Sequence, residues 1–310
     1  MRNITKRGID VLLDTSVEEI LMRGDEVSGV RLINDEKEVI EVQTKSIVVA
    51  TGGFSANSAM VVKYRPDLEG FVTTNHKGAT GSGIALLERI GAGHRGHGRN
   101  SDSPDRRAAD LVSDFPNRFA AAALFSLTSR GTASSTRWRP AIKSRRRLSL
   151  CRNTMLTSSS TSMCGRKTKA ADEYIAKGFV TSASSPRELA EKLGMDYHAF
   201  LATLECYNGA VEKQHDEQFG RTTALRAPIN EGPFHAIRIA PGVHHTMGGV
   251  TINTDGEVLN VAQQPIRGAY AAGEVVGGIH GGNRIGGNAV ADIIIFGTLA
   301  GHQAAKRARG

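Results

Sequence analysis

The first fifty residues pass from one apolar run to the next, with short polar turns in between. The runs lie at 9–13, 17–21, 27–33 and 39–42. Arg23-Gly24-Asp25 and Asn34-Asp35 separate the last three runs, and such residues are typical of turns. Short apolar runs with turn residues between them predict neighbouring strands, so we expect a β-meander in this part of the chain.

Two other runs are continuously apolar. Residues 45–50, Lys-Ser-Ile-Val-Val-Ala, lead into Thr51-Gly52-Gly53-Phe54, and residues 268–274, Gly-Ala-Tyr-Ala-Ala-Gly-Glu, lead into a longer glycine-rich loop. A continuous apolar run is expected of a strand that is buried on both faces. Glycines directly after such a strand allow the backbone to approach a neighbour or a ligand closely.

Helices are predicted where apolar residues recur at helical spacing and end signals flank them. They are expected within 78–92, from Ser185 to Gly194, after Asp196, and from near Asn288 to about Ala305. The start at Ser185 is the clearest, because Ser185 can cap the helix, Pro186 suits its first position and Glu188 completes a capping box.

The stretch from Arg95 to Lys169 shows no such pattern. It contains 13 arginines and 3 lysines against 4 aspartates and no glutamate. The formal charge of the whole chain is +8, so the basic excess belongs to this stretch and the remainder is slightly acidic. Such a stretch attracts phosphate without sequence preference. Its aromatic residues are sparse and form no recognisable motif, so we expect no specific nucleic-acid partner.

Composition indicates a globular protein. The chain has 310 residues, 40% apolar and 23% charged, which is enough to bury a core. Its three cysteines include no Cys-x-x-Cys pair, so we expect neither a disulfide scaffold nor a metal site. No apolar run approaches the roughly 18 residues of a membrane span. No signal sequence is visible, so we expect a cytoplasmic location, with the periplasm open if a signal preceded residue 1.

Residues 277–288, Gly-Gly-Ile-His-Gly-Gly-Asn-Arg-Ile-Gly-Gly-Asn, contain six glycines between a predicted strand and a predicted helix. A strand, a glycine loop and a helix N-terminus direct free N–H groups at an anionic or electron-rich ligand. Glu274, at the end of the strand, is placed to accept a sugar or ribityl hydroxyl. The alternative is a plain strand–helix connection, although six glycines are more than a turn needs.

Five segments together resemble the soluble FAD-dependent fumarate reductase/succinate dehydrogenase flavoproteins. They are 50–54 (ATGGF), 74–81 (TNHKGATG), 244–249 (HHTMGG), 272–274 (AGE) and 280–289 (HGGNRIGGNA). A lone glycine-rich loop is weak evidence for a family, whereas this ordered set is specific. The resemblance covers roughly 1–92 and 170–310.

The resemblance implies an α/β fold with a partial doubly wound, Rossmann-like FAD-binding domain, a β-meander and an inserted α+β capping domain. We expect the FAD-binding domain in 1–92 and 241–310 and the capping domain in 93–240. The family's reaction transfers hydride between flavin N5 and the double bond of an unsaturated dicarboxylic acid, so that fumarate becomes succinate. No haem or iron–sulfur motif is present, so we expect an electron donor outside the chain.

The same resemblance implies roles for individual residues. His244, Arg284 and Gly287 would lie at the substrate, where the planar fork of an arginine grips a carboxylate. Glu274 would hold the ribityl chain of FAD, and His245 would lie against the flavin. The other cofactor-binding residues are expected to be Val17, Ala50, Thr51, Gly52, Gly53, Ala289 and Val290, with backbone contacts from Val17 to adenine.

The sequence departs from the family's pattern in three places. No Gly-x-Gly-x-x-Gly turn precedes the meander, although this turn cradles the pyrophosphate. Ser82 stands where the family usually has Asp. Residues 94–168 lack the family's His-Pro-Thr, Thr-Glu and Gly-Lys-Arg-Phe segments, and the last of these carries the proton-donating arginine. The catalytic residue is therefore unknown.

The composition of residues 94–168 indicates out-of-frame translation. High arginine and serine, no glutamate and a preserved length are what two compensating frameshifts, near residues 93 and 166, would produce. Sequencing the DNA tests this hypothesis, because the other reading frames should then encode the missing segments.

Two functions stay open at this point. The chain is either an FAD-dependent oxidoreductase of the fumarate reductase type whose activity these departures impair, or a non-catalytic truncated fragment or pseudogene product of such a flavoprotein. Flavin absorbance of the purified protein separates the two.

Overall fold

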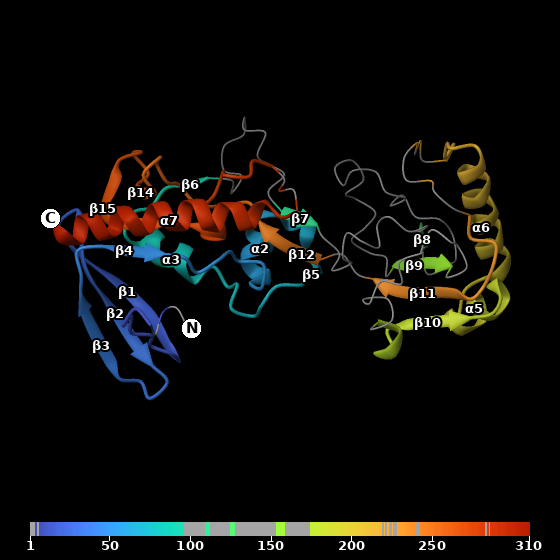
Figure 1. The fold of residues 1–310 in the computed structure, drawn as a ribbon, viewed down its shortest axis with the longest axis horizontal. Coiled ribbons are helices and arrows are strands. Elements are labelled where there is room, and N and C mark those ends of the chain that lie inside the picture. The colour runs from blue at the N-terminus through green and yellow to red at the C-terminus, as the bar shows by residue number, and fades with distance from the viewer. Residues whose placement is uncertain are drawn as a thin grey trace. The chain divides into compact units, whose positions relative to one another are not determined.

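The computed structural model describes residues 4, 6–95, 109–111, 125–127, 153–158, 174–218, 220, 222, 225, 228–239, 242–282, 284 and 286–310 (Figure 1). The chain divides into two compact units. The first contains Met1–Tyr64, Asn75–Asp110 and His245–Gly310, and the second contains Arg65–Thr74 and Leu111–His244. The chain therefore enters the second unit twice.

A three-stranded meander belongs to the first unit. β1 (Thr15–Arg23) and β3 (Val39–Gln43) both pair antiparallel with β2 (Glu26–Asn34). Gly24, in the turn between β1 and β2, has a φ of +64°, which glycine adopts without strain. Three of the four apolar runs predicted as a meander, 17–21, 27–33 and 39–42, each lie within one of these strands, so the prediction is confirmed for these three.

The strand β15 (Pro265–Ala271) joins the meander to the rest of the first unit. It runs parallel to β2 and to β4 (Ile47–Val49), and antiparallel to β14 (Glu257–Leu259). Arg267 of β15 lies opposite Glu26 of β2 although 241 positions separate them. Parallel neighbours so far apart in sequence are typical of a wound α/β sheet, as predicted.

Two strand predictions near the start need correction. Residues 9–13 form no strand, and their apolar side chains are exposed; none of the described strands pairs with them. The run 45–50 contains only the three residues of β4, and burial on both faces is not found. Val48 and Val49 point to opposite faces, and Val49 is buried whereas Val48 is 41% exposed.

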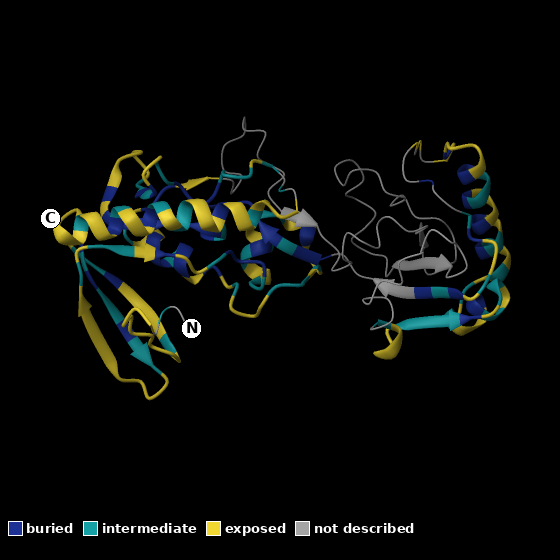
Figure 2. Ribbon diagram, in the orientation of Figure 1, coloured by how far each residue is buried: buried dark blue, intermediate teal, exposed yellow. Residues whose placement is uncertain are grey.

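The helices of the first unit follow the glycine signals. They are α2 (Ser58–Tyr64), α3 (Ser82–Arg89), α7 (Asn288–Arg309) and the 3₁₀ turn η3 (Gly273–Val275). α7 packs on β15, where Ala300 and Ala304 are buried with Tyr270 and Ala272 (Figure 2). The short strands β6 (His94–Arg95) and β13 (Gly249–Val250) pair antiparallel.

A second sheet and two helices make up most of the second unit. β10 (Val180–Ala183), β11 (Phe234–Ile239), β9 (Asn153–Ser158) and β8 (Phe125–Leu127) are antiparallel neighbours in that order. α5 (Pro186–Leu193) and α6 (Tyr197–Glu212) complete this part. Its core includes Leu189, Phe200, Tyr207 and Ile229.

The predicted ends of α5 and α6 are confirmed, but the Glu188 carboxylate accepts from Ser184 N at 2.8 Å and not from Ser185 N, so the capping box is not completed as predicted. The Ser185 side chain accepts a hydrogen bond from Glu188 N at 3.2 Å, and Gly194 ends α5 with a φ of +65°. The Asp196 side chain accepts from Ala199 N at 2.6 Å at the start of α6.

Short elements link the two units along the chain. The 3₁₀ turn η1 (Pro66–Leu68) and β5 (Val72–Thr73) belong to the second unit, and β5 runs parallel to β12 (Gly242–Thr246). Both β7 (Ala109–Leu111) and β12 run across the division between the units.

Candidate functional site

The carboxyl ends of β4 and β15 lie side by side at one edge of the sheet. Ala271, the last residue of β15, lies opposite Val49, the last residue of β4. Glu274 follows β15 on the turn η3. The predicted residues that follow β4 are Ala50, Thr51, Gly52 and Gly53. Ligands bind at this edge in open α/β sheets, so the fold brings these five residues to the expected place.

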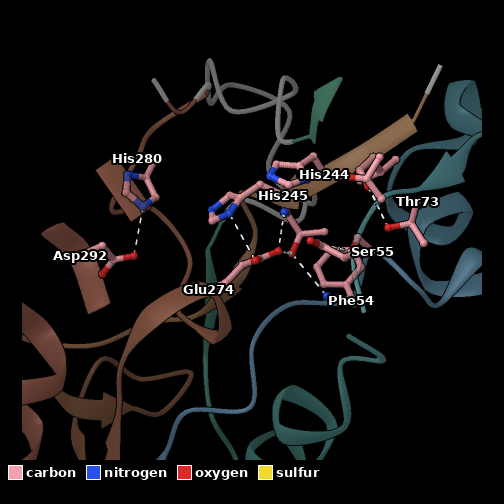
Figure 3. A network of polar contacts seen from close by, with 12 residues as sticks. Phe54, Ser55, Thr73, His244, His245, Glu274, His280 and Asp292 are labelled. Carbon is pink, nitrogen blue, oxygen red and sulfur yellow. Dashed lines mark hydrogen bonds and ion pairs between the residues drawn. The ribbon is translucent and has the colours of Figure 1, made fainter. Parts of the chain in front are cut away.

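Glu274 is the centre of a polar cluster (Figure 3). Its Oε1 accepts hydrogen bonds from Thr246 N at 2.8 Å and Thr246 Oγ1 at 2.9 Å, and its Oε2 lies 3.2 Å from His245 Nδ1. Thr246 Oγ1 in turn accepts from Phe54 N at 3.3 Å. A carboxylate offers about four lone pairs. The described residues therefore use three of them and leave one for a further donor.

The Glu274 carboxyl is set up to stay ionised although it is largely buried. Burial raises its pKa, but the contact with His245 and the two hydrogen bonds from Thr246 lower it, and the pKa of Glu274 lies below its ordinary value. A carboxylate that is fixed by such donors is a strong acceptor for a hydroxyl group.

Gly53 is required by the close approach of Glu274 to the loop after β4. A Cβ atom on Gly53 would overlap the Thr246 hydroxyl and the Glu274 carboxylate. Gly52, directly before it, has a φ of +78°, a region that disfavours other residues. Gly53 is thus required because space is short, and Gly52 is favoured because of its backbone conformation.

The structure adds His280 and Asp292 to the cluster. His280 Nε2 lies 3.0 Å from Asp292 Oδ2, and the His280 ring meets the His245 ring edge to face at 5.4 Å between centroids. Neither residue has a role in the sequence-based prediction. The available signal was a single acid within the apolar segment 289–296 of a predicted helix, since an acid there is buried only when it is paired.

The glycine-rich loop ends at the first turn of α7. Gly278, Gly281 and Gly287 have φ values of +88°, +62° and +92°. Gly287 is the N-cap of α7 and provides no side-chain hydrogen bond, so the positive end of the helix is not balanced by a capping side chain. Ala289 is half-buried and Val290 is 57% exposed in this turn.

The predicted substrate residues fall in both units. Arg284 and Gly287 belong to the first unit, and His244 belongs to the second. Within the second unit, Thr74 Oγ1 lies 2.6 Å from His244 Nδ1. The assembly of these three residues into one carboxylate site stays a prediction.

Val17 lies in the meander, opposite Leu32 of β2. The pairing shifts between Val17 and Glu19, as in a β-bulge, which leaves a residue unpaired in the ladder. Backbone contacts from Val17 to adenine stay a prediction.

The residues at this edge fit FAD in three respects. Glu274 keeps a lone pair for a ribityl hydroxyl, the uncapped N-terminus of α7 suits the electron-rich pyrimidine of the flavin, and Val290 offers apolar surface to a flat ring. No group of three or more His, Cys, Asp or Glu residues in the described part of the chain could hold a metal ion. The fold and the site define a nucleotide-cofactor-binding α/β protein of the flavoprotein type.

Comparison with known proteins identifies the family. The profile of the FAD binding domain family matches residues 1–99 and 106–290. The chain belongs to this family, and FAD is the cofactor that the match assigns to it. The matched range runs through most of the basic stretch, so it is wider than the two regions that the sequence motifs covered.

Relatives specify the resemblance further. The chain is 76% identical over 316 residues to the NADH:fumarate oxidoreductase of Klebsiella pneumoniae (strain 342), covering 100% of this chain and 33% of that protein. It is 36% identical over 320 residues to the fumarate reductase (cytochrome) of Shewanella frigidimarina, covering 98% and 53%. The chain thus spans between a third and about half of these relatives.

A solved structure shares the fold. The open conformation of a flavocytochrome c3 fumarate reductase superposes with a TM-score of 0.80 at 29% sequence identity, over 99% of this chain and 54% of that chain.

Proposed function

We propose that this chain is the flavin-binding part of an FAD-dependent oxidoreductase of the fumarate reductase type, which transfers hydride between flavin N5 and the double bond of an unsaturated dicarboxylic acid. The observation that carries the proposal is the Glu274 cluster at the carboxyl edge of β4 and β15. A plain strand–helix connection needs neither a partly buried carboxylate with three donors nor an uncapped helix beside it. The names of the relatives support the reaction class.

The residues of the cluster have distinct parts in this proposal. Glu274 accepts a ribityl hydroxyl, and His245 is held by Glu274 in a fixed orientation against the flavin. The N-terminus of α7 stabilises the negative charge of the reduced ring. When it is bound, FAD supplies the hydride at N5.

Substrate binding is assigned to Arg284, His244 and Gly287. The guanidinium of Arg284 grips a carboxylate through two parallel hydrogen bonds, which fixes the double bond in one orientation. His244 binds a carboxylate of the substrate, and Gly287 lies at the substrate without a side chain in its way. The proton donor is not assigned to a residue.

The electrons come from a donor outside the chain in this proposal, and the dicarboxylate is the small-molecule partner. The location that we propose is cytoplasmic. No helix in the described ranges has the length and apolar character needed to cross a membrane.

Titration of the purified chain with FAD tests the cofactor site. We expect quenched flavin fluorescence and a stabilisation of about 2.7 kcal/mol at a hundredfold excess of FAD over its Kd. Glu274→Gln should weaken binding, and His302→Gln, at an exposed position of α7, should not. A chain that binds no FAD contradicts the proposal and favours the non-catalytic fragment.

Turnover tests the reaction. Oxidation of a reduced dye should depend on both FAD and fumarate, at a rate impaired by the lack of the family's proton-donor segment. Arg284→Lys should reduce kcat/KM by at least about tenfold, since an ammonium group cannot form the bidentate grip. Arg309→Lys, at the exposed end of α7, is the matched control. Equal kcat/KM values for the two variants would show that Arg284 does not bind the substrate.

A further inference from the structure

Two acid–imidazole pairs lie next to each other at the end of the sheet. His245 Nδ1 is 3.2 Å from Glu274 Oε2, and His280 Nε2 is 3.0 Å from Asp292 Oδ2. The two rings touch edge to face, with an interplanar angle of 74° (Figure 3). All four residues belong to the first unit.

The pairing fixes the position of the ring protons. A carboxylate only accepts hydrogen bonds, so a neutral His245 carries its proton on Nδ1 and a neutral His280 carries its proton on Nε2. Each carboxylate thereby selects one tautomer of its ring for as long as the two groups stay in contact, as in the carboxylate–histidine pairs of metal sites.

The contact between the rings is one of packing. An edge-to-face arrangement places the positive edge of one ring on the negative face of the other, and it transfers no proton. His280 therefore restrains the orientation of the His245 ring without sharing its hydrogen.

Asp292 is the rigid end of this arrangement. It lies on α7 with a side chain only 3% exposed, whereas His280 lies in the loop between Gly278 and Gly281, which both have positive φ. Glycines contribute no side chain that could hold the loop. The bond to Asp292 ties this part of the loop to the helix through side chains.

We infer that Asp292 and His280 are positioning residues for His245: Asp292 holds the His280 ring against α7, and the contact with that ring keeps His245 on Glu274. The consequence for the flavin rests on the proposed function, in which His245 lies against it. The contacts from which the inference is drawn all lie within the chain itself.

Nuclear magnetic resonance of the full chain, labelled with ¹⁵N-histidine and free of FAD, tests the inference. At a pH at which both rings are neutral, we expect a single Nδ1–H tautomer for His245 and a single Nε2–H tautomer for His280, assigned from the peaks lost in His245→Gln and His280→Gln. His302→Gln is the matched control and should leave both patterns unchanged.

Two substitutions of His280 separate its two contacts. His280→Gln retains an amide donor for Asp292 and removes the ring, so the tautomers of His245 should mix. His280→Phe retains a ring and loses the bond to Asp292, so His245 should keep more of its native pattern than in His280→Gln. A His245 spectrum that is native in both variants, with melting curves that show folded protein, overturns the inference.

FAD binding by the same variants separates this inference from the proposed function. His280→Gln should bind FAD about two- to tenfold more weakly, the range expected for one lost ring contact. Adding His280→Gln to His245→Gln should weaken binding no further, because the first residue acts through the second. If the native chain binds no FAD while His245 responds as expected, the proposed function fails and the positioning role stands. If FAD binds and His245 does not respond, the positioning role fails alone.

Discussion

The carboxylate of Glu274 occupies the space that a side chain at Gly53 would fill. This relationship joins the end of β4 to the turn after β15, and the Thr246 hydroxyl lies in the same space. The cluster can therefore form only because residue 53 has no Cβ atom.

Gly53→Ala should disrupt the cluster. Both the hydroxyl and the carboxylate must move, and we expect a loss of about 1–3 kcal/mol in the free energy of unfolding, measured by urea denaturation. Gly297→Ala is the opposite control, because it lies within α7 with open space around it and should add about 0.5–1 kcal/mol. A Gly53→Ala chain as stable as the native one would show that the Thr246 hydroxyl and the Glu274 carboxylate can move aside at no cost in free energy.

Glu274→Gln should change how stability depends on pH. The folded-state pKa of Glu274 is below its ordinary value of 4.5, so the ionised carboxylate stabilises the fold above that pH and this contribution is lost as the pH falls through the folded-state pKa. Glutamine does not titrate. The native chain should exceed the variant in stability by about 1–3 kcal/mol at pH 7.

Denaturation at several pH values checks this expectation. The difference in unfolding free energy should shrink as the pH is lowered from 7 to below 4.5, the ordinary value. A difference that is the same at every pH would mean that Glu274 has no depressed pKa in the folded chain.

Ser185→Ala should destabilise the second unit. It removes the oxygen that accepts from Glu188 N at the start of α5, and such caps contribute about 0.5–2 kcal/mol. Ser185→Thr keeps the oxygen and should restore most of the loss. Hydrogen exchange of the α5 amides locates the effect, and an unchanged exchange rate there would contradict it.

Ala300→Leu should weaken the contact of α7 with the sheet. Ala300 is fully buried with Tyr270 and Ala272, so extra methylene groups overpack the interface and cost about 1–3 kcal/mol. Ala291→Leu, at an exposed position of the same helix, is the control. Equal melting temperatures for the two variants would show that the interface is loosely packed.

The sequence correctly predicted those elements whose ends carry capping residues. Ser185 and Gly194 bound α5 as expected, because capping is decided within one turn of the helix. The strand expected at 9–13 does not form, because a strand depends on a partner that local sequence does not supply. For the same reason the exposure of Val48 could not be read from its apolar neighbours.

The site could be predicted only for residues that directly follow a strand, because the sheet fixes where these residues lie. Gly53 and Glu274 were both predicted to bind the cofactor, and the structure brings them together because the carboxyl ends of the parallel strands β4 and β15 coincide. The pairing of His280 with Asp292 was not predictable, since it depends on how the loop folds back on α7. Residue roles at the substrate remain predictions drawn from the resemblance.

The position of β15 in the sheet also determines when the sheet can be completed during synthesis of the chain. β2 and β4 are synthesised before their shared partner, which begins only at Pro265. On the ribosome, β4 therefore emerges without β15 beside it, whereas β2 can pair at once with its sequence neighbours β1 and β3. Open edges are where nascent chains aggregate, so yield in the cell should depend on chaperones during that interval more than on the stability of the finished fold.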